Sequence, residues 1–171
     1  MAVTLLKGHV SRALDFYNKS DIYLGLGKTT PWEEGESNPP TPLNTDSLVE
    51  IAGYKKVESK FLVIPDDTGT GELSYQNRRW KIVPYDQALD KGARWVYIST
   101  YIAYNEFPTD LVYRQIGVFT GLKVKSSVTS SSFALTPDQV ESQGIPEALD
   151  NRTPIYREAD QRERLTLIIE F

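Results

Sequence analysis

The residues with the clearest chemical pattern are Gly27-Lys28-Thr29-Thr30, which look like the end of a phosphate-binding loop. Such a loop has the pattern G-x-x-x-x-G-K-[ST] and leads into a helix whose first N–H groups bind the phosphates. The first glycine of the pattern is missing, because Ile22 stands in its place. Pro31 follows at once, and proline disfavours the helix that the site needs. We therefore interpret the segment as a strand end followed by a rigid loop.

That loop is rich in proline and contains a large aromatic side chain. Pro39, Pro40 and Pro42 follow Trp32 closely, and the whole stretch 28–46 has neither helical nor strand periodicity. A large aromatic side chain on a stiff loop gains little free energy if it is left exposed to water. We therefore expect Trp32 and the prolines to pack against the domain or a neighbouring subunit, as a fixed protein contact would require.

Other residue patterns that could support chemistry are weak. The chain has no cysteine and His9 is the only histidine, so thiolate catalysis and multi-histidine metal sites are excluded. His9 could serve as a catalytic base, but no G-x-S-x-G motif is present and a solvated surface residue is the favoured interpretation. The acidic stretch of the loop could supply paired carboxylates for acid–base catalysis, but a solvating acidic loop is the favoured interpretation. These acids are Glu33, Glu34 and Glu36.

Two further clusters have competing interpretations. The first cluster resembles a calcium loop and consists of Asp66, Asp67, Thr68, Thr70 and Glu72. A calcium site needs oxygen ligands, but the two threonines stand where carboxylates are preferred, so a solvated turn is the favoured interpretation. A basic–aromatic patch could contact nucleic acid, or it could be a protein-facing patch or a strand edge; it consists of Arg78, Arg79, Trp80 and Lys81. We expect no catalytic residue, no metal and no cofactor.

Composition supports a structural role. The chain has 171 residues, 40% of them hydrophobic, which is enough for one domain with its own core. Its net charge is −4 and it has no basic tail, so we expect no nucleic-acid partner. No apolar run approaches the roughly 20 residues of a membrane helix, and the N-terminus lacks a signal-peptide core, so we expect no membrane contact.

Hydrophobic periodicity predicts a helix at 10–17 within an N-terminal helical segment, 1–20. It predicts strands at 22–26, 60–64, 80–83, 94–104, 111–120 and 165–171, while 47–54 is ambiguous between helix and strand. We expect 111–120 to pair antiparallel with 94–104 through the turn between them. Residues 121–150 are rich in serine, glycine and proline and are expected to form a long loop or arm, with a short helix near Pro137. The predicted fold is mainly β: one antiparallel β-sandwich-like domain, 1–171, with an N-terminal helix and long loops.

A second local motif precedes the last strand. In Asn151-Arg152-Thr153-Pro154 the asparagine can bond to nearby backbone and the proline fixes the direction of the chain. We expect Arg152 to make a charge-assisted hydrogen bond to a carboxylate or to backbone carbonyls, which would hold a turn in place.

Several segments taken together, in this order, resemble one family. They are Leu14-Asp15-Phe16-Tyr17-Asn18, Gly27-Lys28-x-x-Pro31-Trp32, Pro39-Pro40-x-Pro42, Tyr113-Arg114-Gln115-Ile116-Gly117-Val118, Asn151-Arg152-x-Pro154-Ile155, Asp160-Gln161 and the closing Leu167-Ile168-Ile169-Glu170-Phe171. This order is similar to that of the baseplate wedge protein of T-even-type contractile-tailed phages, the gene product eight family. The chain resembles a shortened form, because the family member is longer between the proline loop and the Arg-Gln-Ile strand.

The resemblance implies a non-enzymatic virion protein of the tail baseplate, assembled in the host cytoplasm, that binds other tail subunits and also a copy of itself, as a homo-oligomer such as a dimer. A neck or tail-fibre adaptor is the alternative, and a small nucleotide-binding enzyme is a remote one. The resemblance assigns structural or partner-binding roles to the matching residues: Trp32, Pro39, Pro40, Pro42, Arg114, Gln115, Asn151, Arg152, Pro154, Asp160 and Gln161.

Overall fold

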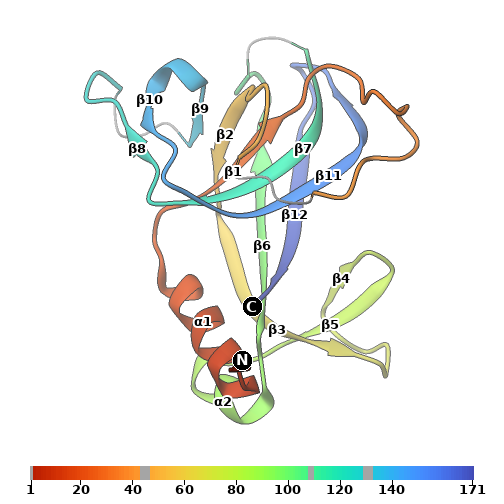
Figure 1. Cartoon of the computed structure of the whole chain (residues 1–171), viewed down its shortest axis with the longest axis vertical. Helices are drawn as coiled ribbons and strands as arrows, with labels where there is room; N and C mark the ends of the chain where they lie inside the picture. Colours follow the sequence, from red (N-terminus) through yellow and green to blue (C-terminus); the bar gives the residue numbers. More distant parts are fainter. Residues whose placement is uncertain (1, 43–46, 108–109, 129–132) are drawn as a thin grey trace. The chain divides into compact units, whose positions relative to one another are not determined.

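The structure is a computed structural model that describes residues 2–42, 47–107, 110–128 and 133–171 (Figure 1). Within these residues the fold is mainly β, with antiparallel sheets and an N-terminal helix, which confirms the predicted sandwich-like class. The helices are α1 (Leu6–Asn18), η1 (Tyr85–Gln87), α2 (Ala88–Lys91) and η2 (Pro137–Gln139). The strands are β1 (Ile22–Gly27), β2 (Gly53–Lys56), β3 (Ser59–Asp66), β4 (Leu73–Tyr75), β5 (Arg78–Ile82), β6 (Trp95–Ile102), β7 (Leu111–Thr120), β8 (Lys123–Val124), β9 (Ala134–Leu135), β10 (Val140–Ser142), β11 (Ile145–Arg157) and β12 (Glu163–Glu170).

The chain forms two compact units, each built from segments that are separated along the sequence. The first unit contains the segment up to Ser20, Glu58–Thr100 and Leu165–Phe171. The second contains Asp21–Val57 and Tyr101–Arg164. The expectation that the whole chain behaves as a single domain stays a prediction, and a test of it is given in the Discussion.

The first unit is a five-stranded sheet, in the order β12-β6-β3-β5-β4, with α1 packed on it. The helix buries Val10, Ala13 and Phe16, residues that share one face at three-residue spacing. The predicted C-terminal strand is confirmed: alternate residues of β12 are buried, and its last partner contact joins the Phe171 N–H to the Arg94 carbonyl at 3.0 Å. The strand predicted at 60–64 is longer in the structure, because β3 continues through Pro65 to Asp66.

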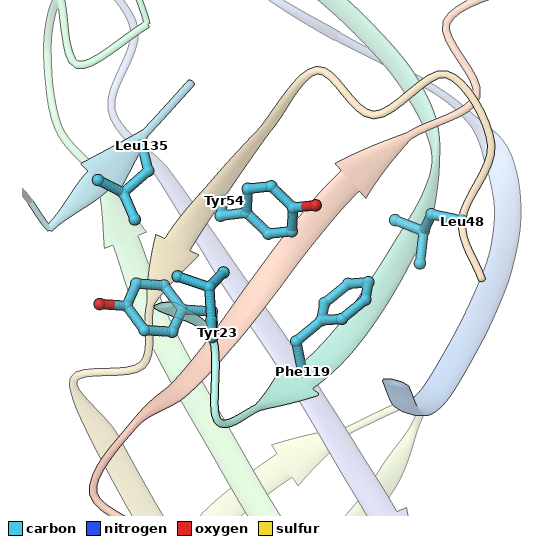
Figure 2. Packing of buried hydrophobic residues seen from close by; sticks show 6 residues of the cluster. Tyr23, Leu48, Tyr54, Phe119 and Leu135 are labelled. Carbon is cyan, nitrogen blue, oxygen red and sulfur yellow. The ribbon is translucent and has the colours of Figure 1, made fainter. Parts of the chain in front are cut away.

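The second unit is built on a five-stranded sheet in the order β11-β7-β1-β2-β9, with a separate β10-β8 pair. Its core is a cluster of buried residues, namely Tyr23, Leu48, Tyr54, Phe119, Leu122 and Leu135. Figure 2 shows these side chains gathered over β1, β2 and β7. Val124 of β8 and Val140 of β10 pack against the same cluster, so the small sheet covers this core.

Two facing glycines make room for this cluster. Gly25 of β1 pairs with Gly117 of β7. A Cβ at Gly117 would lie 2.0 Å from Cδ1 of Leu48, and one at Gly25 would lie 2.6 Å from Cε2 of Phe119. The absence of side chains at both positions therefore lets Leu48 and Phe119 lie directly on the sheet.

Two expectations about the connections were wrong. β7 does not form a hairpin with β6; it pairs with β1 and β11, whereas β6 pairs with β3 and neighbours β12 in the other sheet. Neighbouring strands in sequence pair often but not always, and β7 is buried on both faces and needs two partners of its own. Residues 121–150 are not one long loop, because β8, β9, η2, β10 and the start of β11 lie within the described part of that range.

Candidate functional site

The site is the proline loop, defined here as residues 28–42, which follows β1 and contains neither helix nor strand. Its first residues are held by the carboxylate of Glu50. Glu50 accepts hydrogen bonds from the Thr30 N–H at 2.8 Å, from the Thr30 hydroxyl at 2.8 Å and from the Thr29 hydroxyl at 3.0 Å. The Lys28 ammonium lies 3.3 Å from the same carboxylate. The bond from the Thr30 backbone, with the others, lowers the pKa of Glu50 to about 2.

The geometry of Gly27–Thr30 differs from that of a phosphate-binding loop. The described residues 28–42 contain no helix, so this segment offers no helical N–H groups to a phosphate. Lys28 has a φ of 53°, a left-handed conformation that is uncommon outside glycine, and its N–H bonds to the Val49 carbonyl at 2.7 Å. The segment is a strand end with a sharp turn, as the missing first glycine and Pro31 indicated.

A buried arginine on β7 holds the middle of the proline loop. Arg114, with 3% of its surface exposed, donates from Nε to Glu36 Oε2 at 2.8 Å and from Nη2 to Glu36 Oε1 at 2.6 Å. Its Nη1 donates to the carbonyl of Thr29 at 2.6 Å. The bidentate bond with Arg114 is the main reason that the pKa of Glu36 is lowered. One side chain therefore fixes two points of the loop.

Trp32 connects the loop to β11, the edge strand of the sheet. The pairing of β11 with β7 is irregular between Asn151 and Ile155, and Arg152 lies within this bulge. The indole Nε1 of Trp32 donates to the carbonyl of Arg152 at 2.9 Å, and the side chain is half-buried. Arg152 in turn donates from Nε to Asp150 Oδ2 at 2.7 Å, which confirms the expected charge-assisted bond. The predicted turn at 151–154 is instead a bulge inside a strand.

An amide chain fixes the far end of the loop. Asn151 donates from Nδ2 to the carbonyl of Pro40 at 2.7 Å, and it accepts at Oδ1 from Gln115 Nε2 at 2.9 Å. The other end of the Gln115 side chain accepts from the Val49 N–H at 3.0 Å. Gln115 is only 5% exposed, so its two ends are both used inside the protein. The loop is thus attached to β7 and β11 along its length.

The residues that the resemblance singled out are therefore brought together only in part. Trp32, Pro40, Arg114, Gln115, Asn151 and Arg152 form one connected network, as the bonds above show. Pro39 is half-buried, Pro42 is exposed, and Pro154 lies in β11. Asp160 and Gln161 lie in the turn after β11, where the Gln161 carbonyl accepts from Arg157 Nη2 at 3.0 Å.

Sequence reasoning missed the role of Glu50 and placed Glu36 in a solvating loop. Glu50 has no motif around it that would predict its bonds to the loop, so no local signal could have identified it. Glu36 was noted as one of several acids, but its partner Arg114 is far away along the chain. Ion pairs between distant segments become visible only when the strands have been placed.

The proline loop borders a groove. The groove has a volume of about 250 Å³ and is lined by Lys28, Trp32, Glu33, Glu34 and Pro40. The Lys28 ammonium lies 5.8 Å from the centre of the Trp32 ring. The lining of the groove therefore combines an aromatic ring and a proline with charged groups.

The other candidate clusters have structural roles. Asp66 accepts a hydrogen bond from the Thr68 hydroxyl, and also from the backbone N–H groups of Thr68, Thr70 and Gly71, which closes a turn. The bond from the Thr68 hydroxyl, with the backbone bonds, holds the pKa of Asp66 well below its usual range. Among the residues that the structure describes, no group of three or more His, Cys, Asp or Glu side chains is placed to hold a metal ion.

Two further features named from the sequence have defined places in the structure. His9 lies half-buried in α1. The supposed basic–aromatic patch is divided by strand alternation: Trp80 is buried in the sheet core with Val63 and Tyr97. In the described part of the chain, no helix has the length and apolar character needed to span a membrane.

Comparison with known proteins agrees with a phage structural protein. The chain is 34% identical over 165 residues to the protein named "Virion protein 3" of Enterococcus phage phiEF24C, a match that covers 94% of this chain and 90% of the relative. A family model described as "Baseplate wedge 3 tail fiber network component" matches residues 1–171. Since both matches extend over nearly the whole chain, the protein belongs to the baseplate wedge 3 tail fiber network component family of phage virion proteins.

Proposed function

We propose that the chain is a structural subunit of a contractile-tail baseplate wedge, related to the gene product eight family in a shortened form, and that it acts through protein–protein contacts rather than catalysis. The observation that carries this proposal is the order of the proline loop. Hydrogen bonds to Arg114, Arg152 and Asn151 hold the loop in place at several points. A loop that is already ordered loses little conformational entropy when a partner binds.

The resemblance to gene product eight gains support from geometry. Its loop motif, its Arg-Gln-Ile strand and its Asn-Arg-x-Pro segment come from distant parts of the sequence, yet hydrogen bonds connect them in one network. Motifs that meet in space form one structural unit. Assembly in the host cytoplasm, a homo-oligomeric contact and the absence of nucleic acid belong to the same proposal.

A density map of the assembled particle tests this function directly. The chain should lie in the baseplate wedge, with residues 28–42 against another subunit. Location in the neck, or a proline loop that faces solvent in the particle, would contradict the proposal. The control is a phage that lacks the gene and is complemented with the wild-type chain. Density that returns with the chain belongs to this protein.

A tail-fibre adaptor is the second candidate function. The description of the matching family names a tail fiber network together with the baseplate wedge. An adaptor would use the same ordered loop at the joint between wedge and fibre. Particles that lack the chain would then retain a complete wedge but lose their fibres, whereas a wedge subunit would be needed for the baseplate itself.

Nucleotide binding offers a separate test of the non-enzymatic assignment. Lys28 is already bonded to Glu50 and to the Thr30 hydroxyl, the latter at 2.6 Å. We therefore expect no heat of binding when ATP or GTP is titrated into the purified protein. Micromolar affinity that disappears in Lys28→Ala would reverse this assignment.

A further inference from the structure

The groove beside the proline loop is the right size for a side chain of a protein partner. Its volume of about 250 Å³ lies below the range of roughly 300–1,000 Å³ that is usual for small-molecule and cofactor sites. Interface hot spots, in contrast, are often single side chains that fill small pockets on the partner. The groove is therefore better suited to an anchoring side chain than to a free ligand.

Two lining residues, Trp32 and Pro40, offer apolar surface because their polar groups are already bonded elsewhere. The Trp32 indole N–H is bonded to the Arg152 carbonyl, and the Pro40 carbonyl accepts from Asn151. What remains is the proline ring and the indole ring, over which the Lys28 ammonium lies 5.8 Å from the ring centre. An apolar side chain can cover both without leaving a buried polar group unpaired.

The two acidic residues of the lining have the opposite character. Glu33 and Glu34 are both exposed, and within the described residues neither carboxylate has a hydrogen bond or an ion pair. The nearby cation Lys28 is bonded to Glu50 instead. Two unpaired carboxylates in the same lining as Trp32 and Pro40 are complementary to a positive charge that accompanies an apolar group.

We propose that this groove receives a segment of another tail subunit, which places an apolar side chain against Trp32 and a lysine or arginine against Glu33 and Glu34. This inference rests on the proposed function and specifies the chemistry of its partner. The cation would approach the carboxylates at the rim, and the apolar group would exclude water from the ring.

Charge reversal tests the proposal in the assembled particle. A phage that lacks the gene is complemented with the chain carrying Glu33→Lys and Glu34→Lys, and incorporation into particles is measured. We expect it to fall about tenfold or more, because like charges would then meet across the contact. The matched control is Glu141→Lys, an exposed acid on β10, which should be incorporated like the wild type. Wild-type incorporation of the double variant would overturn the proposal.

Cross-linking identifies the occupant independently of any charge change. The chain has no cysteine, so Ser37→Cys introduces a unique thiol at an exposed position of the proline loop that lines the groove. A benzophenone attached to this thiol is irradiated in assembled particles, and the adduct is sequenced. We expect a peptide of a different tail subunit that contains a lysine or arginine next to an apolar residue. An adduct confined to this chain or to a second copy of it, or a peptide without a basic residue, would overturn the proposal.

The two proposals fail in distinguishable ways. If the chain is absent from the baseplate of wild-type particles, the proposed function is wrong. If the chain occupies the wedge but the double charge reversal has no effect, the function stands and only the assignment of this groove falls.

Discussion

At the residue scale, Arg114 is the side chain on which the order of the proline loop depends most. Its planar guanidinium reaches Glu36 and the Thr29 carbonyl at once, a geometry that lysine cannot reproduce. It is buried at 3% exposure on a central strand, so its position is fixed by the sheet. Arg114 therefore attaches the loop to β7 at two separate points.

Replacing Arg114 with methionine should release the loop. Charge-assisted hydrogen bonds are lost, and we expect the free energy of unfolding to fall by about 1.5–3 kcal/mol in urea titrations. The NMR signal of the Trp32 indole N–H should also shift, since its bond to Arg152 depends on the position of the loop. Arg79→Met is the control, because Arg79 is exposed, and it should change stability by no more than about 0.5 kcal/mol. Equal effects of both variants would argue against the role of Arg114.

Acid should loosen the start of the loop through Glu50. The pKa of Glu50 is lowered from 4.5 to about 2, chiefly by the bond from the Thr30 N–H. A carboxyl group whose pKa is lower in the folded chain stabilises that state when ionised, so its contribution is complete above about pH 4.5 and disappears as the pH falls towards 2. We expect the Thr30 amide signal to move over this interval in NMR spectra. In Glu50→Gln this titration should vanish, whereas Glu141→Gln should leave it unchanged; a titration that persists in Glu50→Gln would contradict the assignment.

At the element scale, the last strand contributes more to the stability of the fold than its length suggests. Leu165, Leu167 and Ile169 of β12 are 2%, 5% and 8% exposed, so strand alternation places all three in the core. β12 is also an edge strand beside β6 and completes its sheet on that side. The strand therefore supplies both apolar burial and backbone pairing.

Removing residues 165–171 should abolish folding. Burial of three large apolar side chains at about 1.5–3 kcal/mol each amounts to about 5–9 kcal/mol, which is comparable to the whole stability of a typical domain, about 5–15 kcal/mol. Removing residues 2–4 should matter little, because Ala2, Val3 and Thr4 are exposed and α1 begins after them. Soluble expression and thermal melting of the two truncated chains decide the comparison, and a folded protein without 165–171 would show that β12 is dispensable.

At the scale of the whole molecule, both units are assembled from interleaved segments. The boundary between them falls within β6, between Thr100 and Tyr101, and within β12, between Arg164 and Leu165. Neither unit can be excised as one continuous stretch of sequence. Two strands are thus shared along the chain, and unfolding one unit would disturb strands that the other uses.

We therefore expect cooperative unfolding of the whole chain. Differential scanning calorimetry should show one transition whose calorimetric enthalpy equals the van 't Hoff enthalpy. This outcome would support the prediction that residues 1–171 form a single domain. Two resolved transitions, or a calorimetric enthalpy well above the van 't Hoff value, would show that the two units unfold independently.

The sequence by itself determined the local features of this protein. Alternation of apolar residues predicted the last strand, proline predicted a stiff loop after β1, and the missing glycine and Pro31 predicted a strand end there instead of a phosphate-binding loop. The order of short motifs also indicated a phage baseplate protein, and the matches to baseplate and virion proteins agree with it. Each of these conclusions depends on neighbouring residues, whose preferences are set by backbone conformation and side-chain shape.

Only the tertiary structure decided which distant segments meet. The partner of β7 was predicted as β6 but is β1 on one side and β11 on the other. Residues 121–150 were predicted as a loop because serine and glycine are common there, yet short strands form where other parts of the chain supply hydrogen-bond partners. The bonds of Glu50 and Arg114 to the proline loop follow the same rule. Strand pairing and ion pairs are interactions between residues far apart in sequence, and a single sequence does not encode them in any local pattern.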